Sequence, residues 1–530
     1  MMARTSPTKG VLPPVIQAML KPEFYPHPVP FVELKQTHLS YVLLAGEFAY
    51  KVRKAVRFAF IDCSSVARRR ALSESEVELN RRLSPDVYLA VIAICQTDGQ
   101  IVFDESSETR DAVEFAVKMR RLQEERRLDF LVKRRIVAAS DIRVIANTIR
   151  DFHAITPNTR SWDYGAAGNI WKMVIGNLVE IEQLVPPEPV LKKVAQIETY
   201  SRRYIAAHWE LLNARAHQGH VREGHGDLRA DAVYLTSNGI RIIDCLEFDE
   251  RLRYGDIANE VAFLAMDIDR LGRRDLARQL IEYFADDPDA AVLIPFYKSY
   301  RATVRAKVEL LRSRQPDSGA EEKKAALANA GQLFDLALEY AAAPRALLIV
   351  CGASGTGKST LAAALSQHLG LTVFSSDVIR KGLAGIAQNN SAAAPYNQGI
   401  YAAEFTAHVY DSLIVAARKV LHTRKGVILD ATFGKRNQRQ LLIDAMEGTG
   451  MKPLFVECRA DQDVIIRRLR QQEKDSQRVS DATVGIYLSQ VKEFDPLDEI
   501  PPALHEIVDT ADDLTEIILR IERRIYLTQY

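Results

Sequence analysis

Hydrophobic and polar positions alternate over much of the first 120 residues, as they do in half-buried β-strands. Residues 38–52 alternate on both sides of the turn Ala45-Gly46-Glu47, which predicts a β-hairpin. Residues 64–83 carry apolar side chains on a charged background, the pattern of an amphipathic helix. Strand character returns over 86–119, in the stretches DVYLAVIAICQT and AVEFAVKM. The first 120 residues are therefore expected to form a sheet accompanied by a helix.

Helical periodicity dominates from about residue 125 to residue 312. Two short strands interrupt it, VYL and GIRIID, which flank the turn Ser237-Asn238-Gly239. The polar stretch 313–324 contains Pro and Gly and predicts a loop. A helix follows it over KAALANAGQLFDLALEYAA and ends before Pro344. This half of the chain is expected to be of the α+β class.

The pattern changes after Pro344. Short apolar strands, in ALLIVC, LTVFSSD, GVILDAT and KPLFVEC, alternate with helical stretches. Strands that alternate with helices predict a parallel α/β sheet covered on both faces. We therefore expect two different domains, residues 1–342 and residues 343–530.

Composition narrows the class of protein. The 530 residues are 47% hydrophobic and 26% charged, with a formal net charge of +1, which is ordinary for a soluble globular protein and disfavours a nucleic-acid coat protein. The five cysteines form no C-x-x-C pair, and no apolar run approaches the ~20 residues that span a membrane. A cytoplasmic protein that has no membrane partner is the expectation.

A glycine-rich turn between a predicted strand and a predicted helix carries the strongest chemical signal. Residues 352–359, GASGTGKS, fit the pattern G-x-x-x-x-G-K-[ST], in which backbone N–H groups surround phosphates at a helix N-terminus. Lys358 is expected to reach the β- and γ-phosphates of ATP, and the Ser359 hydroxyl is expected to bind Mg²⁺. The predicted nucleotide-binding residues are Gly352, Ala353, Ser354, Gly355, Thr356, Gly357, Lys358, Ser359 and Thr360.

Polar residues follow two of the predicted strands of this half. Asp430 ends the strand GVILD, where a carboxylate can hold Mg²⁺ or orient water; the alternative is a residue that caps the next turn. Asp377 and Arg380 follow the strand LTVFSS at helical spacing. Asp377 is a candidate base for a hydroxyl proton and Arg380 a candidate anchor for an anionic substrate; the alternative is a helix cap beside a solvated arginine.

The segments GASGTGKSTLA, SSDVIRKGLAG, VILDATF and SDA resemble the P-loop kinases that include gluconate kinases, zeta-toxin-like kinases and polynucleotide 5′-hydroxyl kinases. The resemblance covers most of residues 346–530. It implies transfer of the ATP γ-phosphate to a hydroxyl, with Asp377 as base and Arg380 as substrate anchor. The basic stretch 465–478 stands where this group carries an arginine lid, so Arg467, Arg468 and Arg470 are candidates for it.

Four residues of the first half occur in the order that a kinase-like site requires. Such a site uses a strand lysine paired with a helix glutamate for the α- and β-phosphates, a base in the catalytic loop, and a later aspartate for Mg²⁺. Lys51 and Glu76 are expected to supply the nucleotide pair, and Asp227, in the sequence HGDLR, the base. Asp244, at the end of RIID, is the expected metal ligand.

The stretches AYKVRKAVRFAFIDCSS, HGDLR and IDCLEFDERLRYGDIANEVAFLAMDID resemble aminoglycoside-phosphotransferase-like proteins over most of residues 30–310. More closely, they resemble a bacterial family in which such a domain precedes a P-loop kinase. The resemblance implies a protein-kinase-like fold and ATP binding, without naming the acceptor. The chain departs from the pattern at Ala232, where such loops carry a metal-binding Asn.

The sequence thus predicts a bifunctional phosphotransferase that uses ATP and Mg²⁺ and acts on a hydroxyl of a small molecule. Ala232 leaves open whether the first site transfers phosphate or only binds nucleotide and regulates the second. A third hypothesis is a kinase acting on nucleic-acid 5′-hydroxyl ends, which the near-neutral net charge disfavours.

Overall fold

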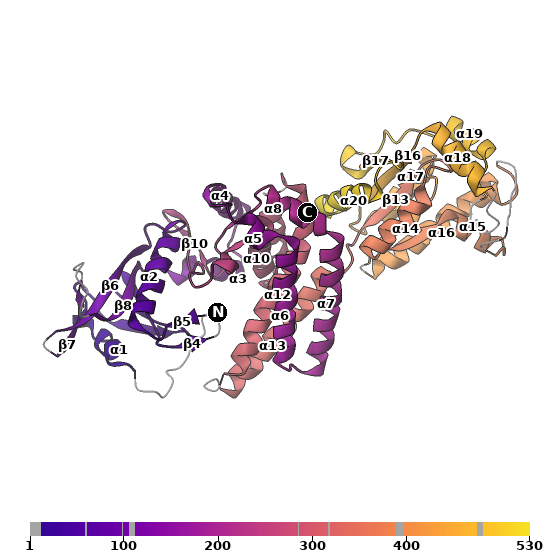
Figure 1. Ribbon diagram of the computed structural model, residues 1–530. Coiled ribbons are helices and arrows are strands. Elements are labelled where there is room, and N and C mark those ends of the chain that lie inside the picture. Colours follow the sequence, from indigo (N-terminus) through magenta and orange to yellow (C-terminus); the bar gives the residue numbers. More distant parts are fainter. Residues whose placement is uncertain are drawn as a thin grey trace. The chain divides into compact units, whose positions relative to one another are not determined.

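The computed structural model describes residues 12–58, 61–97, 99–104, 112–282, 284, 286–315, 319–387, 390, 397–423, 425–473 and 481–529. The chain divides into two compact units, Met1–Ala341 and Ala342–Tyr530. Figure 1 shows an antiparallel sheet and a helical bundle in the first unit, and a parallel sheet between helices in the second. Among these residues, none of the helices has both the length and the apolar character that crossing a bilayer requires.

The first unit begins with a six-stranded sheet of order β1-β2-β3-β8-β6-β7, in which every neighbouring pair is antiparallel. Ala45 pairs with Phe48 across the turn of β2 and β3, so the predicted hairpin is confirmed. The strands are β1 (Val32–Gln36), β2 (Ser40–Ala45), β3 (Phe48–Arg53), β6 (Tyr88–Thr97), β7 (Gln100–Asp104) and β8 (Ala112–Arg120), and a separate pair is β4 (Arg57–Phe58) with β5 (Ile61–Asp62).

Helix α2 (Val66–Arg81) packs on strands β6 and β8 (Figure 1). It begins at Ser65, whose side chain accepts a hydrogen bond from the N–H of Arg68, a common N-cap. Glu76 and Val77 lie on its buried side. A hydrophobic cluster that includes Ile16 of α1 (Pro14–Met19) packs against β2, β3 and β6. Glu76 contacts strand β3 through ion pairs with Lys51 and Arg53.

Long helices form the rest of the first unit. Helices α12 (Pro288–Ser313) and α13 (Ala320–Ala341) pack side by side with α6 (Ala167–Gln183), α7 (Glu188–Ala207) and α10 (Ile257–Arg270). Helix α13 begins at Ala320, inside the loop predicted over 313–324; acidic residues in its first turn favour a helix N-terminus there. The other helices are η1 (Pro22–Phe24), η2 (Glu124–Arg126), α3 (Leu128–Lys133), α4 (Ala139–Ile155), α5 (Ser161–Gly165), α8 (Trp209–His217), α9 (Glu250–Arg253) and α11 (Arg274–Glu282).

Two small antiparallel ribbons flank the segment 224–232. The first pairs β9 (Val221–Glu223) with β12 (Tyr254–Asp256). The second pairs β10 (Val233–Thr236) with β11 (Gly239–Ile242), which confirms the strands predicted around residues 237–239. The segment that carries Asp227 is thus anchored at both ends by strand pairing, and Asp244 follows the second ribbon by two residues.

The second unit is built on a parallel sheet of order β14-β15-β13-β16-β17, as the alternating pattern predicted. One hydrophobic cluster packs Leu347 and Ile349 against α16, and another packs Leu348 and Val350 against α14 and α20, so both faces are covered. The strands are β13 (Leu347–Cys351), β14 (Thr372–Ser375), β15 (Val427–Asp430), β16 (Pro453–Arg459) and β17 (His505–Asp509). The helices are α14 (Lys358–Leu369), α15 (Ser376–Leu383), η3 (Gly399–Tyr401), α16 (Ala403–His422), α17 (Arg436–Met446), α18 (Gln462–Gln472), α19 (Val484–Glu493), η4 (Pro502–Leu504) and α20 (Leu514–Gln529).

Candidate functional site

The glycine-rich segment forms a tight loop between β13 and the N-terminus of α14. Gly352, Gly355 and Gly357 have φ values of 133°, 80° and 90°, a region that disfavours any residue with a Cβ. A Cβ on Gly352 would lie 2.5 Å from the carbonyl oxygen of Cys458, so a side chain at this position would clash with the neighbouring strand. The loop ends at the first turn of α14, where unpaired N–H groups and the helix dipole favour an anion.

Lys358 folds back over this loop. Its Nζ donates a hydrogen bond of 2.7 Å to the carbonyl oxygen of Ala353, at the other end of the loop. The N–H of Ser354 donates to Oε1 of Gln490 in α19, at 2.8 Å. A lysine ammonium and backbone donors therefore gather at one glycine-rich turn, which is the arrangement that binds polyphosphates.

Ser359 and Asp430 form a hydrogen-bonded pair beside the loop. The Ser359 hydroxyl donates to Oδ2 of Asp430 at 2.7 Å. The two meet because β15 pairs with β13 in parallel register, which places Asp430 opposite Val350, two residues before the loop. Burial raises the pKa of Asp430, against the opposing effects of Lys358 and Ser359. A hydroxyl and a carboxylate in contact are oxygen ligands of the kind that Mg²⁺ prefers.

Asp377 and Arg380 lie on α15, at the same edge of the sheet. Ser375 at the end of β14 is in register with Asp430, and the negative charge of Asp377 contributes to the raised pKa of Asp430. Arg380 is buried: its Nη1 donates to the carbonyl oxygen of Ile400 at 2.6 Å and to the Thr406 hydroxyl at 3.0 Å. Its Nε has no hydrogen-bond partner among the residues that the structure describes.

Two contacts of the second unit went unnoticed in the sequence. Gln490 lies more than a hundred residues from the loop that it caps, and nothing in its neighbourhood marks it. Arg468, a candidate for the lid, donates from Nη1 and Nη2 to Oγ1 and O of Thr510, at 2.8 and 3.0 Å. Thr510 donates in turn to the carbonyl oxygen of Thr356. Arg468 thus holds the segment after β17 against the glycine-rich loop; residues 474–478 of the basic stretch lie outside the described residues.

In the first unit, Lys51 lies between two carboxylates. Its Nζ is 2.7 Å from Oε1 of Glu76 and 3.3 Å from Oδ1 of Asp244. Burial disfavours the charged amine, but the carboxylates of Glu76 and Asp244 outweigh it and raise the pKa of Lys51. The Lys51 ammonium in turn lowers the pKa of Asp244. The three residues, separated by up to 193 positions in sequence, form one charged cluster.

Glu260 of α10 contacts the backbone of the segment that carries Asp227. The Glu260 carboxylate accepts hydrogen bonds from the backbone N–H groups of His225 and Gly226, and lies 2.6 Å from Nε2 of His153. A Cβ on Gly224 would lie 2.2 Å from Oε2 of Glu260, so only glycine allows this close approach. The ring of His225 is buried, which lowers its pKa, and contacts the carbonyl oxygen of Ile243. His225 therefore orients the backbone as a neutral imidazole.

Asp227 contacts an arginine, and its side chain is 26% exposed. Arg229 donates from Nε to Oδ2 of Asp227 at 3.0 Å and from Nη1 to Oδ2 of Asp231 at 2.8 Å. Burial would raise the pKa of Asp227, but the charge of Arg229 prevails and lowers it. Ala232 is 3% exposed; its backbone N–H donates to the carbonyl oxygen of Arg229, and its carbonyl oxygen accepts from the N–H of Ile243. A guanidinium thus bridges two carboxylates beside the position where the expected Asn is missing.

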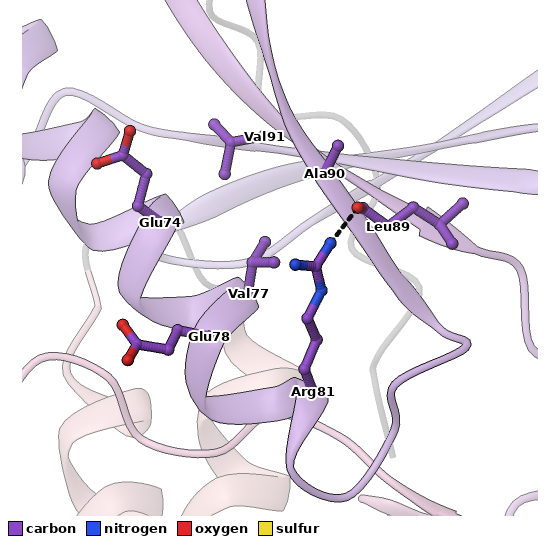
Figure 2. Close-up of a pocket in the computed structure, with 7 residues that line it drawn as sticks. All are labelled: Glu74, Val77, Glu78, Arg81, Leu89, Ala90 and Val91. Carbon is purple, nitrogen blue, oxygen red and sulfur yellow. Dashed lines mark hydrogen bonds between the residues drawn. The ribbon is translucent and has the colours of Figure 1, made fainter.

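A hollow of about 390 Å³ lies between α2 and β6, apart from these residues (Figure 2). Arg81 crosses it and donates a hydrogen bond to the carbonyl oxygen of Leu89. None of the predicted site residues contributes to its wall. The lining residues are Glu74, Val77, Glu78, Arg81, Leu89, Ala90 and Val91.

Replacing Glu260 with glutamine is expected to destabilise the first unit in a pH-dependent way. Its hydrogen bonds to His153 and His225 lower the pKa of Glu260 from 4.5 to about 2 in spite of burial. A carboxylate whose folded pKa is lowered stabilises the fold above its unfolded pKa, here by about 3 kcal/mol, and loses that contribution as the pH falls towards the folded pKa. Glu260→Gln should therefore cost about 3 kcal/mol at pH 7, and the difference from wild type should shrink between about pH 4.5 and pH 2.

Urea denaturation followed by tryptophan fluorescence measures this effect in the whole chain. All three tryptophans, Trp162, Trp171 and Trp209, lie in the first unit, so the signal reports on that unit alone. Glu78→Gln, at an exposed position of α2, is the matched control and should change the unfolding free energy by less than about 0.5 kcal/mol. A Glu260→Gln deficit that stays constant with pH would show that packing, not charge, is responsible.

A family model and several solved structures are similar to parts of this chain. A family model described as an AAA domain matches residues 347–497, which include the phosphate loop and Asp430. The predicted P-loop domain is thereby confirmed. A choline/ethanolamine kinase family protein from Mesorhizobium loti aligns over 62% of this chain and 97% of its own, at 12% identity and a TM-score of 0.35. A gluconokinase from Sinorhizobium meliloti aligns over 36% of this chain and 94% of its own, at 20% identity and a TM-score of 0.24.

The chain also has relatives that match it across both units. The uncharacterized proteins Rv2004c of Mycobacterium tuberculosis and Mb2027c of Mycobacterium bovis are each 31% identical to it over 451 residues, which is 84% of this chain and 87% of the relative. An alignment of this extent includes parts of both units. The chain belongs to the family of these uncharacterized mycobacterial proteins.

Proposed function

We propose that this protein is an ATP-dependent phosphotransferase with two kinase-like sites. The domain of residues 343–530 transfers the γ-phosphate of ATP to a hydroxyl of a small molecule, and the domain of residues 1–342 contains a second site of the same type. The observation that carries the proposal is the contact between Ser359 and Asp430 at the end of a glycine-rich loop, with Lys358 and Asp377 beside it. Positioning and charge stabilisation of this kind supply most of the catalysis of phosphoryl transfer.

The residues of the second unit fit MgATP. Backbone N–H groups of the phosphate loop and Lys358 would hold the phosphates, while Ser359 and Asp430 would supply oxygen ligands to Mg²⁺. The metal ion, when bound, neutralises the charge that develops on the phosphate oxygens. In the first unit, Lys51 and Asp244 are suited to the same two tasks, since a lysine paired with Glu76 lies beside a carboxylate.

Asp377 is our candidate for the base of the second unit, and Arg380 for the residue that orients the acceptor. Asp377 lies close enough to Asp430 for its charge to affect that residue's pKa, at the sheet edge where the phosphate loop ends. Arg380 keeps one buried N–H without a partner among the described residues, a donor that an acceptor oxygen would satisfy. Both residues come from the first turns of α15, so they are placed by one rigid element.

A second candidate function applies to the first unit alone. If Arg229 keeps Asp227 engaged and Ala232 leaves the metal weakly held, this unit binds nucleotide without transferring phosphate and regulates the other. The contact of Arg229 with Asp227 is the observation that favours this alternative. Phosphoryl transfer by the first site would support the phosphotransferase, and its absence together with ATP binding would support the regulatory function.

Replacing Asp377 with asparagine should lower phosphoryl transfer by the second site about 100-fold, because the acceptor hydroxyl loses its base. Binding of ATP should change by less than about threefold, because Asp377 is assigned no contact with the nucleotide. The assay incubates protein that carries Asp227→Asn, so that the first site does not contribute, with a metabolite pool and labelled ATP, and detects labelled products by mass spectrometry. Asp411→Asn, at an exposed position of α16, is the control. Wild-type transfer by Asp377→Asn would remove Asp377 from the mechanism.

A further inference from the structure

Helix α12 carries three arginines along one side. Arg301, Arg305 and Arg312 lie within about 40° of one another at 100° per residue, and span about 16 Å at 1.5 Å per residue. We call them the α12 arginine row. A row of like charges on one side of a helix is unfavourable unless anionic groups face it. The contacts of the three side chains indicate whether protein carboxylates or a bound ligand supply these anionic groups.

Arg301, at one end of the α12 arginine row, contacts the catalytic loop. Its Nη1 donates to the carbonyl oxygen of Gly226 at 3.3 Å, and its Nε donates to Oδ1 of Asn259 at 2.8 Å. Gly226 precedes Asp227, the candidate base of the first unit. The row therefore begins at the place where an acceptor hydroxyl would lose its proton.

Arg305 lies one helical turn farther along. It is partly buried, and it forms no hydrogen bond or ion pair with the residues for which the structure gives a position. Burial lowers the pKa of Arg305, and the positive charge of Arg229 lowers it further, while the carboxylates of Asp227, Asp267 and Asp231 act in the opposite direction. Arg305 thus lies within electrostatic reach of both the base and its arginine. A guanidinium whose five N–H donors lack partners in this setting would be stabilised by an anionic ligand.

The outer end of the row lies against the turn between β1 and β2. Nε2 of Gln315, just after α12, is 2.9 Å from Nε2 of His38 in that turn. Burial lowers the pKa of His38, and the charges of Lys54 and Arg312 lower it further. The two charged groups that lower the pKa of His38 are therefore both cations, Lys54 after strand β3 and Arg312 of α12. Arginines of α12 thus lie both beside the catalytic loop and beside the edge of the sheet.

We propose that the α12 arginine row binds the acceptor of the first site, and that this acceptor is an alcohol already bearing phosphate or carboxylate groups. The proposal rests on the phosphotransfer function proposed above. Arg305 would bind the anionic group while Asp227 accepts the proton of the hydroxyl. The hydroxyl oxygen forms a bond to the γ-phosphorus of ATP as the bond from that phosphorus to the bridging oxygen breaks, and ADP leaves. An acceptor carrying ammonium groups would be repelled by the same row.

The acceptor test uses the full-length chain with Lys358→Ala, so that transfer reports on the first site. A metabolite pool is divided into anionic, neutral and cationic fractions, and each is incubated with labelled ATP. Label is expected in the anionic fraction, and Arg305→Gln should raise KM about tenfold with kcat within about threefold, since a charge-assisted contact is lost. Lys307→Gln is the control, because Lys307 lies on another side of α12 and pairs with Glu180. Pretreating the anionic fraction with phosphatase identifies the anionic group of the acceptor. Labelling is lost if that group is a phosphate, and it remains if the group is a carboxylate.

A binding measurement keeps this proposal separate from the proposed catalysis. Pyrophosphate is titrated calorimetrically into the same protein saturated with a non-hydrolysable MgATP analogue. Arg305→Gln should weaken pyrophosphate binding about tenfold, and Lys307→Gln less than twofold. If no fraction accepts label, the proposed activity fails, and Arg305-dependent pyrophosphate binding alone would still support the anion site. Label in the neutral or cationic fraction overturns the inference. Pyrophosphate affinity that Arg305→Gln leaves unchanged also overturns it.

Discussion

Replacing Lys358 with alanine is expected to lower phosphoryl transfer by the second unit by about 100- to 1000-fold. The ammonium group is the one side-chain cation of the glycine-rich loop, and in the structure it reaches across the loop to the carbonyl oxygen of Ala353. A positioned donor that faces developing negative charge contributes about this much to catalysis. The effect should appear mainly in kcat, because the loop N–H groups that hold the ground-state phosphates remain.

The measurement compares initial rates of label transfer from ATP in a background that carries Asp227→Asn, so that the first unit does not contribute. Lys452→Ala serves as the control, because Lys452 is exposed and precedes β16 at the far end of the sheet from the phosphate loop. It removes an equal charge and should leave the rate unchanged. Transfer by Lys358→Ala at more than a tenth of the rate of Lys452→Ala would contradict the role of Lys358.

Local patterns sufficed to predict most of the elements of both units. The hairpin of β2 and β3 follows from alternation around a glycine turn, and β13, β15 and β16 follow from apolar runs between helices. Strand β17 escaped detection because HEIVD contains only two apolar residues, and its pairing with β16 stabilises it instead. Helix α13 begins before its apolar period does, because acidic residues favour its first turn.

Pairs of residues that a motif links were predictable, whereas contacts between distant segments were not. The proximity of Lys51, Glu76 and Asp244 followed from the order of a kinase-like site, although up to 193 positions separate them. The capping of Ser354 by Gln490 depends on how α19 packs, which no local pattern encodes. The sequence likewise identified Ala232 as a departure from the pattern, but it did not show that Arg229 would contact Asp227.

Arg229 changes how the missing asparagine is understood. A kinase-like site with two metal ions uses an Asn to hold one of them, and Ala232 offers no ligand there. The guanidinium of Arg229 is a fixed positive charge that contacts Asp227 and Asp231 in the same segment. Part of the charge that a second ion would supply is therefore already present in the protein. We expect the first site to depend on Asp244 as its principal protein ligand for Mg²⁺.

Replacing Asp227 with asparagine in the Lys358→Ala chain is therefore expected to abolish the remaining phosphoryl transfer, with a loss of about 1000-fold. Asparagine keeps the size of the side chain but cannot accept the hydroxyl proton, and loss of a general base costs about 10²- to 10⁴-fold. The Arg229 guanidinium lowers the pKa of Asp227, so the carboxylate remains ionised from pH 5 to pH 8. The rate should therefore not change with pH near neutrality.

The assay measures label transfer to the metabolite pool between pH 5 and pH 8, with Asp151→Asn, an exposed substitution on α4, as the matched control. Equal rates for Asp227→Asn and Asp151→Asn would exclude Asp227 as the base. If the Lys358→Ala chain transfers no label while still binding ATP, and Lys51→Ala removes that binding, the first unit is the regulatory nucleotide sensor. The choice between the two functions depends on whether Arg229 releases Asp227 when an acceptor binds, because a carboxylate engaged by a guanidinium is a weaker base than a free one.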